Sequence, residues 1–173
     1  MAYRKGSSER NSLHNKDYSF EEGVKAYTET ILSQKNIIAI TPHDNQLIAF
    51  MSFIHNYERL DYFPQDPKED DIVNYITTLI VHPEHRRKGI GNFLYDYIEN
   101  DLPEQMHANC VAVRTWDINH GHIELLKKRG YSLTCTLHQE RVVERDYGNE
   151  MHDTVYFCKR VNRKQTTLHI TQH

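Results

Sequence analysis

The sequence predicts an α/β protein built on a single mixed, mostly antiparallel sheet with helices on both of its faces. Runs rich in β-branched and aromatic residues, typical of strands, alternate along the chain with runs whose apolar residues recur at helical spacing. In order, these runs read as a helix, a two-strand hairpin, a long strand, a helix, a strand, a helix and a second hairpin. This order is typical of one sheet covered by helices.

Each predicted helix begins or ends at a recognisable signal. Ser19-Phe20-Glu21-Glu22 matches a capping box, in which a serine and a glutamate satisfy each other's free backbone N–H groups. Gly130 stands where helices end on a left-handed residue. Helices are therefore expected over residues 20–33, from Ile90 to the Leu102-Pro103 step, and over residues 117–128.

The predicted strands follow apolar runs that are bounded by turn residues. Residues 47–55 are apolar on nearly both faces, which predicts a central strand. Leu133, Cys135 and Leu137 alternate with polar residues and are expected on one face. Pro83 has no N–H for a ladder, so the longest strand should end before it. Strands are expected over residues 36–41, 47–55, 72–82, 110–115, 132–138 and 154–159.

Length and charge indicate one domain that binds neither nucleic acid nor membrane. We expect a loose segment over residues 1–17, one domain over 18–160 and a polar tail over 161–173. The formal net charge of −3 argues against general nucleic-acid binding. No apolar run approaches the ~20 residues that span a membrane, and no secretory signal is recognisable.

Cysteines and histidines give no sign of a disulfide framework or a metal site. The three cysteines are odd in number and widely spaced, which fits reduced thiols and a cytoplasmic location. The closest histidine pairs, His82-x-x-His85 and His120-x-His122, have no cysteine or carboxylate partners at zinc spacing. We therefore expect no bound metal.

A basic segment with two glycines, Arg86-Arg87-Lys88-Gly89-Ile90-Gly91, joins the longest predicted strand to the next helix. The glycines let a ligand approach the backbone, and the helix start offers free N–H groups and partial positive charge. Together with the basic side chains, these features indicate a phosphate or diphosphate site. The spacing fits neither a dinucleotide fold nor a nucleoside-triphosphate loop. The alternative is a tight turn with solvated basic residues.

The pattern Arg86-x-x-Gly89-x-Gly91, after a strand that ends Val81-x-Pro83, resembles the acetyl-CoA loop of the GCN5-related N-acetyltransferases (GNAT). The resemblance covers residues 36–160, where the order of elements is also that of the family. A second segment, Asn119 to Tyr131, resembles the family's Asn-x-x-Ala…Tyr-x-x-x-Gly-Phe motif. The resemblance implies an enzyme that transfers an acetyl group from acetyl-CoA to a primary amine by direct attack within a ternary complex.

The resemblance also implies which residues contact the co-substrate. Free backbone groups at the end of the longest strand would bind the pantetheine arm and polarise the thioester carbonyl, and the glycine-containing turn would bind the diphosphate. Asn119 would contact the arm, although a role as a helix cap is equally compatible. The implied cofactor-binding residues are Leu79, Ile80, Val81, Arg86, Arg87, Lys88, Gly89, Ile90, Gly91, Asn92 and Asn119.

Two features depart from the family pattern. The family opens with a strand and two helices before the first hairpin, whereas only one helix is predicted here. The family's tyrosine that protonates the departing thiolate is replaced by Leu126. Tyr131, Tyr97 or solvent can take that role, since a thiol pKa of ~8.5 makes the thiolate a tolerable leaving group.

The base that takes the amine proton is expected beside the central strands. Glu58, Glu69 and Tyr75 are the candidates, with Asp70 and His55 as further options. Each of these side chains is also compatible with an ordinary loop or sheet position.

The predicted loop over residues 57–71 carries six acidic side chains against two basic ones, and this charge favours a cationic amine acceptor.

Two other hypotheses about the function stay open. The chain can be a non-catalytic acyl-CoA-binding sensor or interaction module, which Leu126 favours, or a nucleotide- or phosphoprotein-binding domain that uses the basic turn. The sequence also leaves open whether the protein forms a homodimer.

Overall fold

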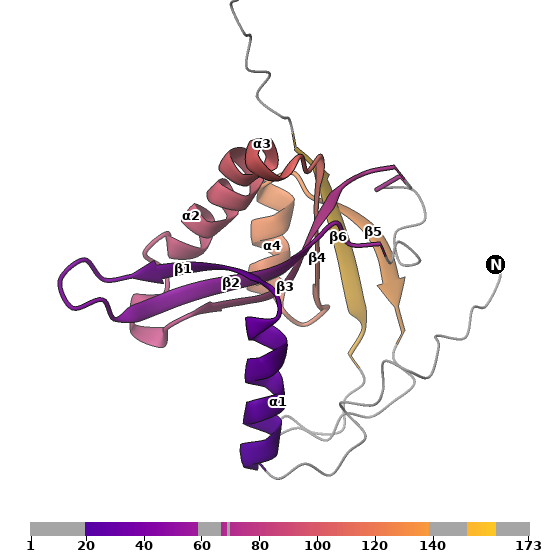
Figure 1. The fold of residues 1–173 in the computed structure, drawn as a ribbon. Coiled ribbons are helices and arrows are strands. Elements are labelled where there is room, and N and C mark those ends of the chain that lie inside the picture. The colour runs from indigo at the N-terminus through magenta and orange to yellow at the C-terminus, as the bar shows by residue number, and fades with distance from the viewer. Residues whose placement is uncertain (1–19, 59–66, 69, 139–151, 162–173) are drawn as a thin grey trace, which may run out of the picture. The chain divides into compact units, whose positions relative to one another are not determined.

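The computed structural model describes residues 20–58, 67–68, 70–138 and 152–161 (Figure 1). The chain divides between Ser33 and Gln34 into two units, each of which is described by itself. The expectations for residues 1–17, and for all of the C-terminal tail except Val161, lie outside the described residues, as does the question of an additional first strand there.

The described part of the first unit is a helix, α1 (Phe20–Leu32), as the capping box and the apolar spacing predict. Thr28 and Thr30 donate their hydroxyls to the carbonyls four residues earlier, at 2.8 and 2.9 Å. These bonds satisfy the hydroxyls within the helix itself.

The second unit contains a six-stranded sheet in the order β1-β2-β3-β4-β6-β5. Its only parallel neighbours are β3 and β4, and the other four neighbouring pairs are antiparallel. The predicted mixed, mostly antiparallel sheet is therefore confirmed. The strands are β1 (Lys35–Ile40), β2 (Leu47–His55), β3 (Val73–Val81), β4 (Cys110–Trp116), β5 (Ser132–Leu137) and β6 (Thr154–Arg160).

Strand β5 differs from its predicted pattern. Its pairing with β6 shifts register between Leu133 and Cys135, which is the signature of a bulge. Cys135 and Leu137 pack against a buried cluster, but Leu133 is 57% exposed. The prediction that all three residues share one face is therefore wrong, because one extra residue in the strand reverses the alternation.

The helical run that follows the glycine-containing turn is longer than predicted. It comprises α2 (Ile90–Asp96), a π-helical turn η4 (Tyr97–Asp101) and α3 (Leu102–Met106). The prediction that Leu102-Pro103 ends the helix is wrong. Pro103 lies in the first turn of α3, where the missing N–H is tolerated. The last helix, α4 (His120–Lys128), begins three residues later than predicted because Asn119 caps it.

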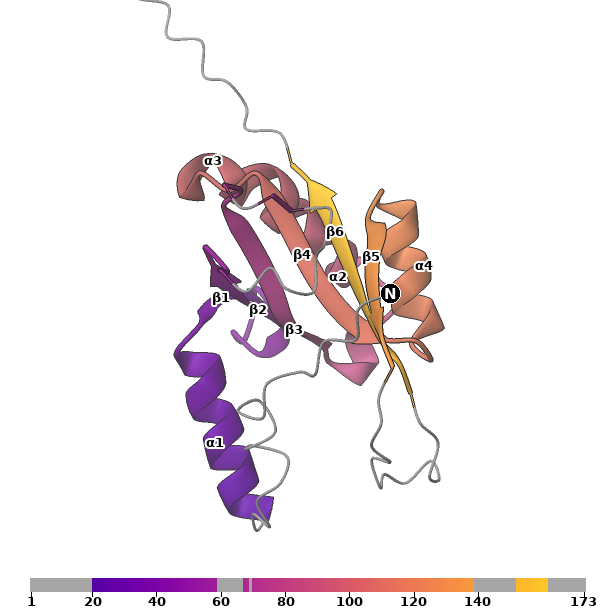
Figure 2. The same ribbon diagram turned by 90° about the vertical axis from the view of Figure 1, so that its right-hand side faces the viewer.

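Two buried clusters lie on opposite faces of the sheet. The larger one joins β2, β3, β4 and β6 to α2, η4 and α4, with Phe53, Leu94, Tyr95 and Leu126 at most 2% exposed. Accordingly, α2, α3 and α4 lie together on one side of the sheet (Figure 2). The smaller cluster occupies the other face and includes Tyr75. Within the described residues, no helix combines the length and apolar character needed to cross a bilayer.

Candidate active site

The candidate site lies where the two parallel strands at the centre of the sheet separate. Strand β3 pairs with β4 only through Val73–Ile76, opposite Cys110–Val113. Beyond these residues β3 continues beside β2 up to Val81, and β4 continues beside β6 up to Trp116. Strands β1 to β3 therefore diverge from β4 to β6, as Figure 1 shows. Within the described residues, the divergence leaves one edge of each central strand without a strand partner.

A β-bulge lies at the point of separation. Ser52 pairs with Thr78 and Phe53 pairs with Ile76, so Thr77 is the extra residue on β3. The Thr77 hydroxyl donates to the Ser52 carbonyl at 3.1 Å, which holds the bulge against β2. Bulges bend a strand and increase its twist. The bulge thus explains why β3 turns away from β4 directly after Ile76.

The backbone amides beyond the bulge alternate in direction. His82 donates its N–H to the Ile48 carbonyl of the β2 side at 2.8 Å. Because amide direction alternates along a strand, the amides of Leu79 and Val81 point to the opposite side, where β4 no longer pairs. The amide of Ile80 points toward β2. Of these three predicted arm-binding residues, the geometry therefore favours Leu79 and Val81 for backbone contacts with a ligand.

The glycine-containing turn follows directly from this free edge. A 3₁₀ turn, η3 (Pro83–His85), ends β3 as the proline predicts, and Arg86 donates its Nε to the Val81 carbonyl at 3.1 Å. Arg87 and Gly89 have left-handed backbones, with φ of 63° and 84°. Turns of this kind direct successive N–H groups toward one point and bind anions.

The start of α2 leaves room for a ligand at its backbone. Phe93 donates the first hydrogen bond of the helix, to the Gly89 carbonyl at 3.0 Å. The N–H groups of residues 90–92 precede it and have no acceptor within the helix. A Cβ built on Gly89 or Gly91 meets nothing within 4 Å. Arg87 and Lys88 are exposed beside this space and add positive charge.

The start of α4 borders the separation from the side of β4. Asn119 caps this helix by accepting from the His122 N–H at 3.4 Å, and its amide donates to the Thr115 hydroxyl at 3.2 Å. The capping role that the sequence allowed is therefore present. The Tyr95 hydroxyl of α2 lies 2.7 Å from His122 Nε2. Burial lowers the pKa of His122, which favours its neutral ring.

The candidate bases occupy different parts of the structure, and Tyr75 belongs to the smaller cluster on the other face of the sheet. Tyr75 is 5% exposed, and its ring stacks on Tyr57 with centroids 4.3 Å apart. Glu58 is exposed next to Tyr57, and Asp70 is also exposed. Glu69 lies outside the described residues. His55 contacts the amide oxygen of the buried Asn74 at 2.9 Å, which gives it a structural partner within the sheet.

An arginine that is not among the sequence-predicted site residues, Arg114, lies at the point of separation. Arg114 follows Val113, the last residue of β4 that pairs with β3, and it lies opposite Tyr156 of β6. Partial burial opposes its charge, but Tyr75 and Tyr156 outweigh this effect and raise the pKa of the guanidinium. A charged residue within the otherwise apolar run of this strand was the signal that could have drawn attention to it.

Comparison with known proteins decides the family. A sequence profile for the acetyltransferase (GNAT) family matches residues 9–131. The chain belongs to the GNAT family. It is 33% identical over 111 residues to N-alpha-acetyltransferase 60 of Drosophila melanogaster, covering 56% of this chain and 40% of that protein. The chain therefore spans less than half the length of this relative.

Solved GNAT structures share the fold at low sequence identity. NAA60 of Arabidopsis thaliana in complex with a bisubstrate analogue superposes with a TM-score of 0.59, at 16% identity, over 80% of this chain and 82% of that one. The ribosomal-protein-S18-alanine N-acetyltransferase of Escherichia coli gives a TM-score of 0.59 at 13% identity, over 90% and 84% of the two chains. At such identities the likeness shows the fold alone.

The position that carries the family's proton-donating tyrosine is part of the core in this GNAT protein. Leu126 is fully buried in the larger cluster. Of the two tyrosines considered as substitutes, Tyr131 is only 5% exposed, and burial raises the pKa of its hydroxyl. Tyr97 is partly buried. Among the described residues, no group of three or more histidine, cysteine or carboxylate side chains is arranged to hold a metal ion.

Proposed function

We propose that this protein transfers an acetyl group from acetyl-CoA to a primary amine by direct attack within a ternary complex. One observation carries the proposal: the free edge of β3 leads without interruption into the left-handed, glycine-containing turn. The single segment from Leu79 to Asn92 thus offers backbone donors for both the pantetheine arm and the diphosphate of one extended ligand.

Backbone groups do most of the chemistry in this proposal. The Leu79 N–H, on the side where β4 no longer pairs, donates to the thioester oxygen as negative charge develops on it. The N–H groups of residues 90–92 hold the diphosphate, and Arg87 and Lys88 supplement its charge balance. The nitrogen of the neutral amine bonds to the carbonyl carbon as the carbon–sulfur bond breaks. The nitrogen loses one proton and the departing thiolate gains one, so the step leaves an amide and the CoA thiol.

Tyr75 is our candidate for the side chain that relays the amine proton. It precedes Ile76, the last residue of β3 that pairs with β4, and Arg114 carries a permanent positive charge on the same face of the neighbouring strand. A positive charge beside a phenol favours its ionised form. Glu58 and Glu69 stay alternative bases, since exposed carboxylates can act through a water molecule.

The acceptor we favour is the α-amine of a peptide or protein. The support is the likeness to N-alpha-acetyltransferase 60 and to an enzyme named for the alanine of a ribosomal protein. The acidic residues of the 57–71 segment fit a cationic acceptor. A cytoplasmic location and a homodimer stay predictions from the sequence.

Thiol release from acetyl-CoA tests the proposal. Acceptors are a peptide with a free N-terminus, the same peptide with a blocked N-terminus and one lysine, and spermidine. We expect turnover with the free N-terminal peptide and little with the blocked one. Turnover with spermidine alone would contradict a peptide acceptor but keep the enzyme class.

A non-catalytic acyl-CoA-binding module is the second candidate, and the buried Leu126 favours it. Titration calorimetry with CoA distinguishes the two functions. CoA binding without turnover on any acceptor of the panel would favour the binding module. If ATP bound as tightly as CoA, the proposed ligand would be wrong.

A further inference from the structure

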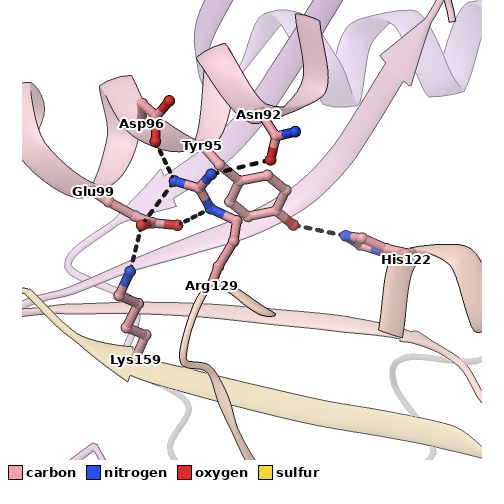
Figure 3. A network of polar contacts seen from close by, with 7 residues as sticks. All are labelled: Asn92, Tyr95, Asp96, Glu99, His122, Arg129 and Lys159. Atoms are coloured by element: carbon pink, nitrogen blue, oxygen red, sulfur yellow. Dashed lines mark hydrogen bonds and ion pairs between the residues drawn. The ribbon is translucent and has the colours of Figure 1, made fainter. Parts of the chain in front are cut away.

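A network of polar contacts connects the diphosphate-binding turn to two distant elements (Figure 3). Its centre is Arg129, the residue that follows α4, whose side chain is only 13% exposed. The guanidinium donates from Nη1 to the Asn92 amide oxygen at 3.2 Å and from Nη2 to Asp96 at 2.6 Å. It also donates to both carboxylate oxygens of Glu99, at 2.8 and 3.0 Å.

The network also contains a second cation with a narrower role. Lys159 of β6 contacts Glu99 at 2.5 Å, on the carboxylate oxygen that also accepts from Arg129 Nη2. The Glu99 side chain is 2% exposed, and cationic partners offset the hydration that a buried carboxylate loses. Lys159 and Arg129 thus share this task, but within the described network Arg129 is the residue that binds Asn92 and Asp96.

We propose that Arg129 is a positioning residue for the diphosphate: it holds Asn92 and neutralises Asp96 so that the N–H groups of residues 90–92 stay available to the ligand. This inference rests on the proposed function, because it assumes that CoA binds at this turn. Arg129 does not touch the ligand itself. It acts through Asn92, the third residue of α2.

Two physical effects support this role. A free asparagine oxygen near a helix start competes for nearby backbone N–H groups, and the hydrogen bond from Arg129 occupies that oxygen. Asp96 lies one helical turn beyond Asn92, on the same face of the helix. An unpaired carboxylate there would offset the positive potential of the helix start and would repel an incoming diphosphate.

The Arg129 side chain is suited to holding Asn92 and Asp96. Burial opposes the charge on Arg129, but its bonds to Glu99 and Asp96 outweigh it and raise the pKa of the guanidinium. The guanidinium also lies over the Tyr95 ring, 5.4 Å from its centroid, so a buried aromatic side chain fixes its position. A lysine keeps the charge but lacks the planar fork that reaches three acceptors.

The test measures CoA affinity by titration calorimetry in matched variants. R129Q removes the guanidinium that binds Asn92 and Asp96, and with it one partner of Glu99. K159M also removes one partner of Glu99 but leaves Asn92 in place. We expect R129Q to weaken CoA binding about tenfold and R129K to restore part of the loss, whereas K159M stays within twofold of the wild type although it lowers the melting temperature.

A double mutant and a ligand fragment show whether the effect passes through Asn92. We expect N92A, which removes the competing oxygen, to bind CoA within twofold of the wild type, and R129Q/N92A to recover part of the affinity that R129Q loses. In R129Q, binding of 3′-phosphoadenosine 5′-diphosphate, which lacks the pantetheine arm, should weaken by the same factor as binding of CoA. If R129Q fails to fold, R129K and R129K/N92A carry the test.

Three results would overturn the inference: R129Q within twofold of the wild type, K159M as weak as R129Q, or fully additive effects of R129Q and N92A. Each of them leaves CoA binding by the wild type intact, and with it the proposed function. If the wild type does not bind CoA, the proposed function fails first and this inference fails with it.

Discussion

Replacing Gly91 with alanine should separate folding from ligand binding. Gly91 is the second residue of α2, its φ is not left-handed, and a Cβ built on it meets nothing within 4 Å. The protein itself therefore accepts the methyl group. Alanine is more favourable than glycine in a helix by about 0.5–1 kcal/mol. For a chain of this size the gain corresponds to a rise of about 1–3 °C in melting temperature.

The same methyl group should obstruct the diphosphate. Cα–Cβ bonds of a helix tilt toward its N-terminus, which is the side from which the ligand approaches the N–H groups. Losing one hydrogen bond between an amide and a charged group costs about 1.5–3 kcal/mol. We therefore expect Gly91→Ala to raise the Kd for CoA by about ten- to a hundredfold while the protein becomes slightly more stable.

Calorimetric titration with CoA and thermal unfolding together test this prediction. Gly23→Ala is the matched control, because Gly23 lies within α1 and its Cβ position is also open. The control should gain similar stability without a change in Kd. Gly89→Ala is less informative, since a φ of 84° strains any side chain and lowers stability as well. Unchanged CoA affinity in a folded, stabilised Gly91→Ala protein would refute the assignment of the diphosphate to this turn.

Three further variants test other parts of the site and fold. Tyr75→Phe should lower kcat about a hundredfold with little change in the KM for acetyl-CoA, because only a proton relay is lost; steady-state kinetics measures both. Neutralising Glu58, Glu69 and Asp70 together should raise the KM for a cationic amine, and an unchanged KM would remove the idea that their charge attracts the acceptor. Burial alone would raise the pKa of Asp71, but the Arg160 guanidinium holds this pKa below 3.8. The ionised Asp71 therefore stabilises the folded protein fully above pH 3.8, and this contribution fades as the pH falls further. Urea unfolding should therefore show Asp71→Asn less stable than wild type by about 2–3 kcal/mol at pH 7, with a smaller difference below pH 4.

Local signals in the sequence predict the elements and the turn, because these depend on residues close together in the chain. The bounds of β2 and the start of α2 at Ile90 agree with the prediction, and Pro83 ends β3 as expected. The left-handed backbone predicted at Gly130, just after α4, is likewise confirmed, because glycine adopts positive φ without a Cβ clash. Where a single residue dictates the backbone, the sequence is sufficient.

Pairings between distant residues could not be predicted. Asp71 was counted among the charges of the acidic loop, yet its carboxylate is buried against Arg160, 89 positions away, at 2.7 Å. That negative charge is therefore not available to attract an acceptor, and the attraction rests on the other loop residues. The sequence also does not predict that the β3–β4 ladder ends at Ile76, because no particular residue type marks the bulge at Thr77.

The leucine at position 126 argues less strongly against catalysis than the loss of a family residue suggests. A general acid contributes about 10²–10⁴-fold, and a thiolate whose thiol pKa is ~8.5 leaves without full protonation near neutral pH. Positioning of the reactants and donors aimed at the developing oxyanion contribute more, and both depend on backbone groups. In the proposed function, the free edge of β3 and the turn at Gly89 provide those groups, whatever side chain stands at position 126. Because Leu126 is fully buried in the core, it supports the packing of α4, and a tyrosine there would have to bury its hydroxyl or displace the helix.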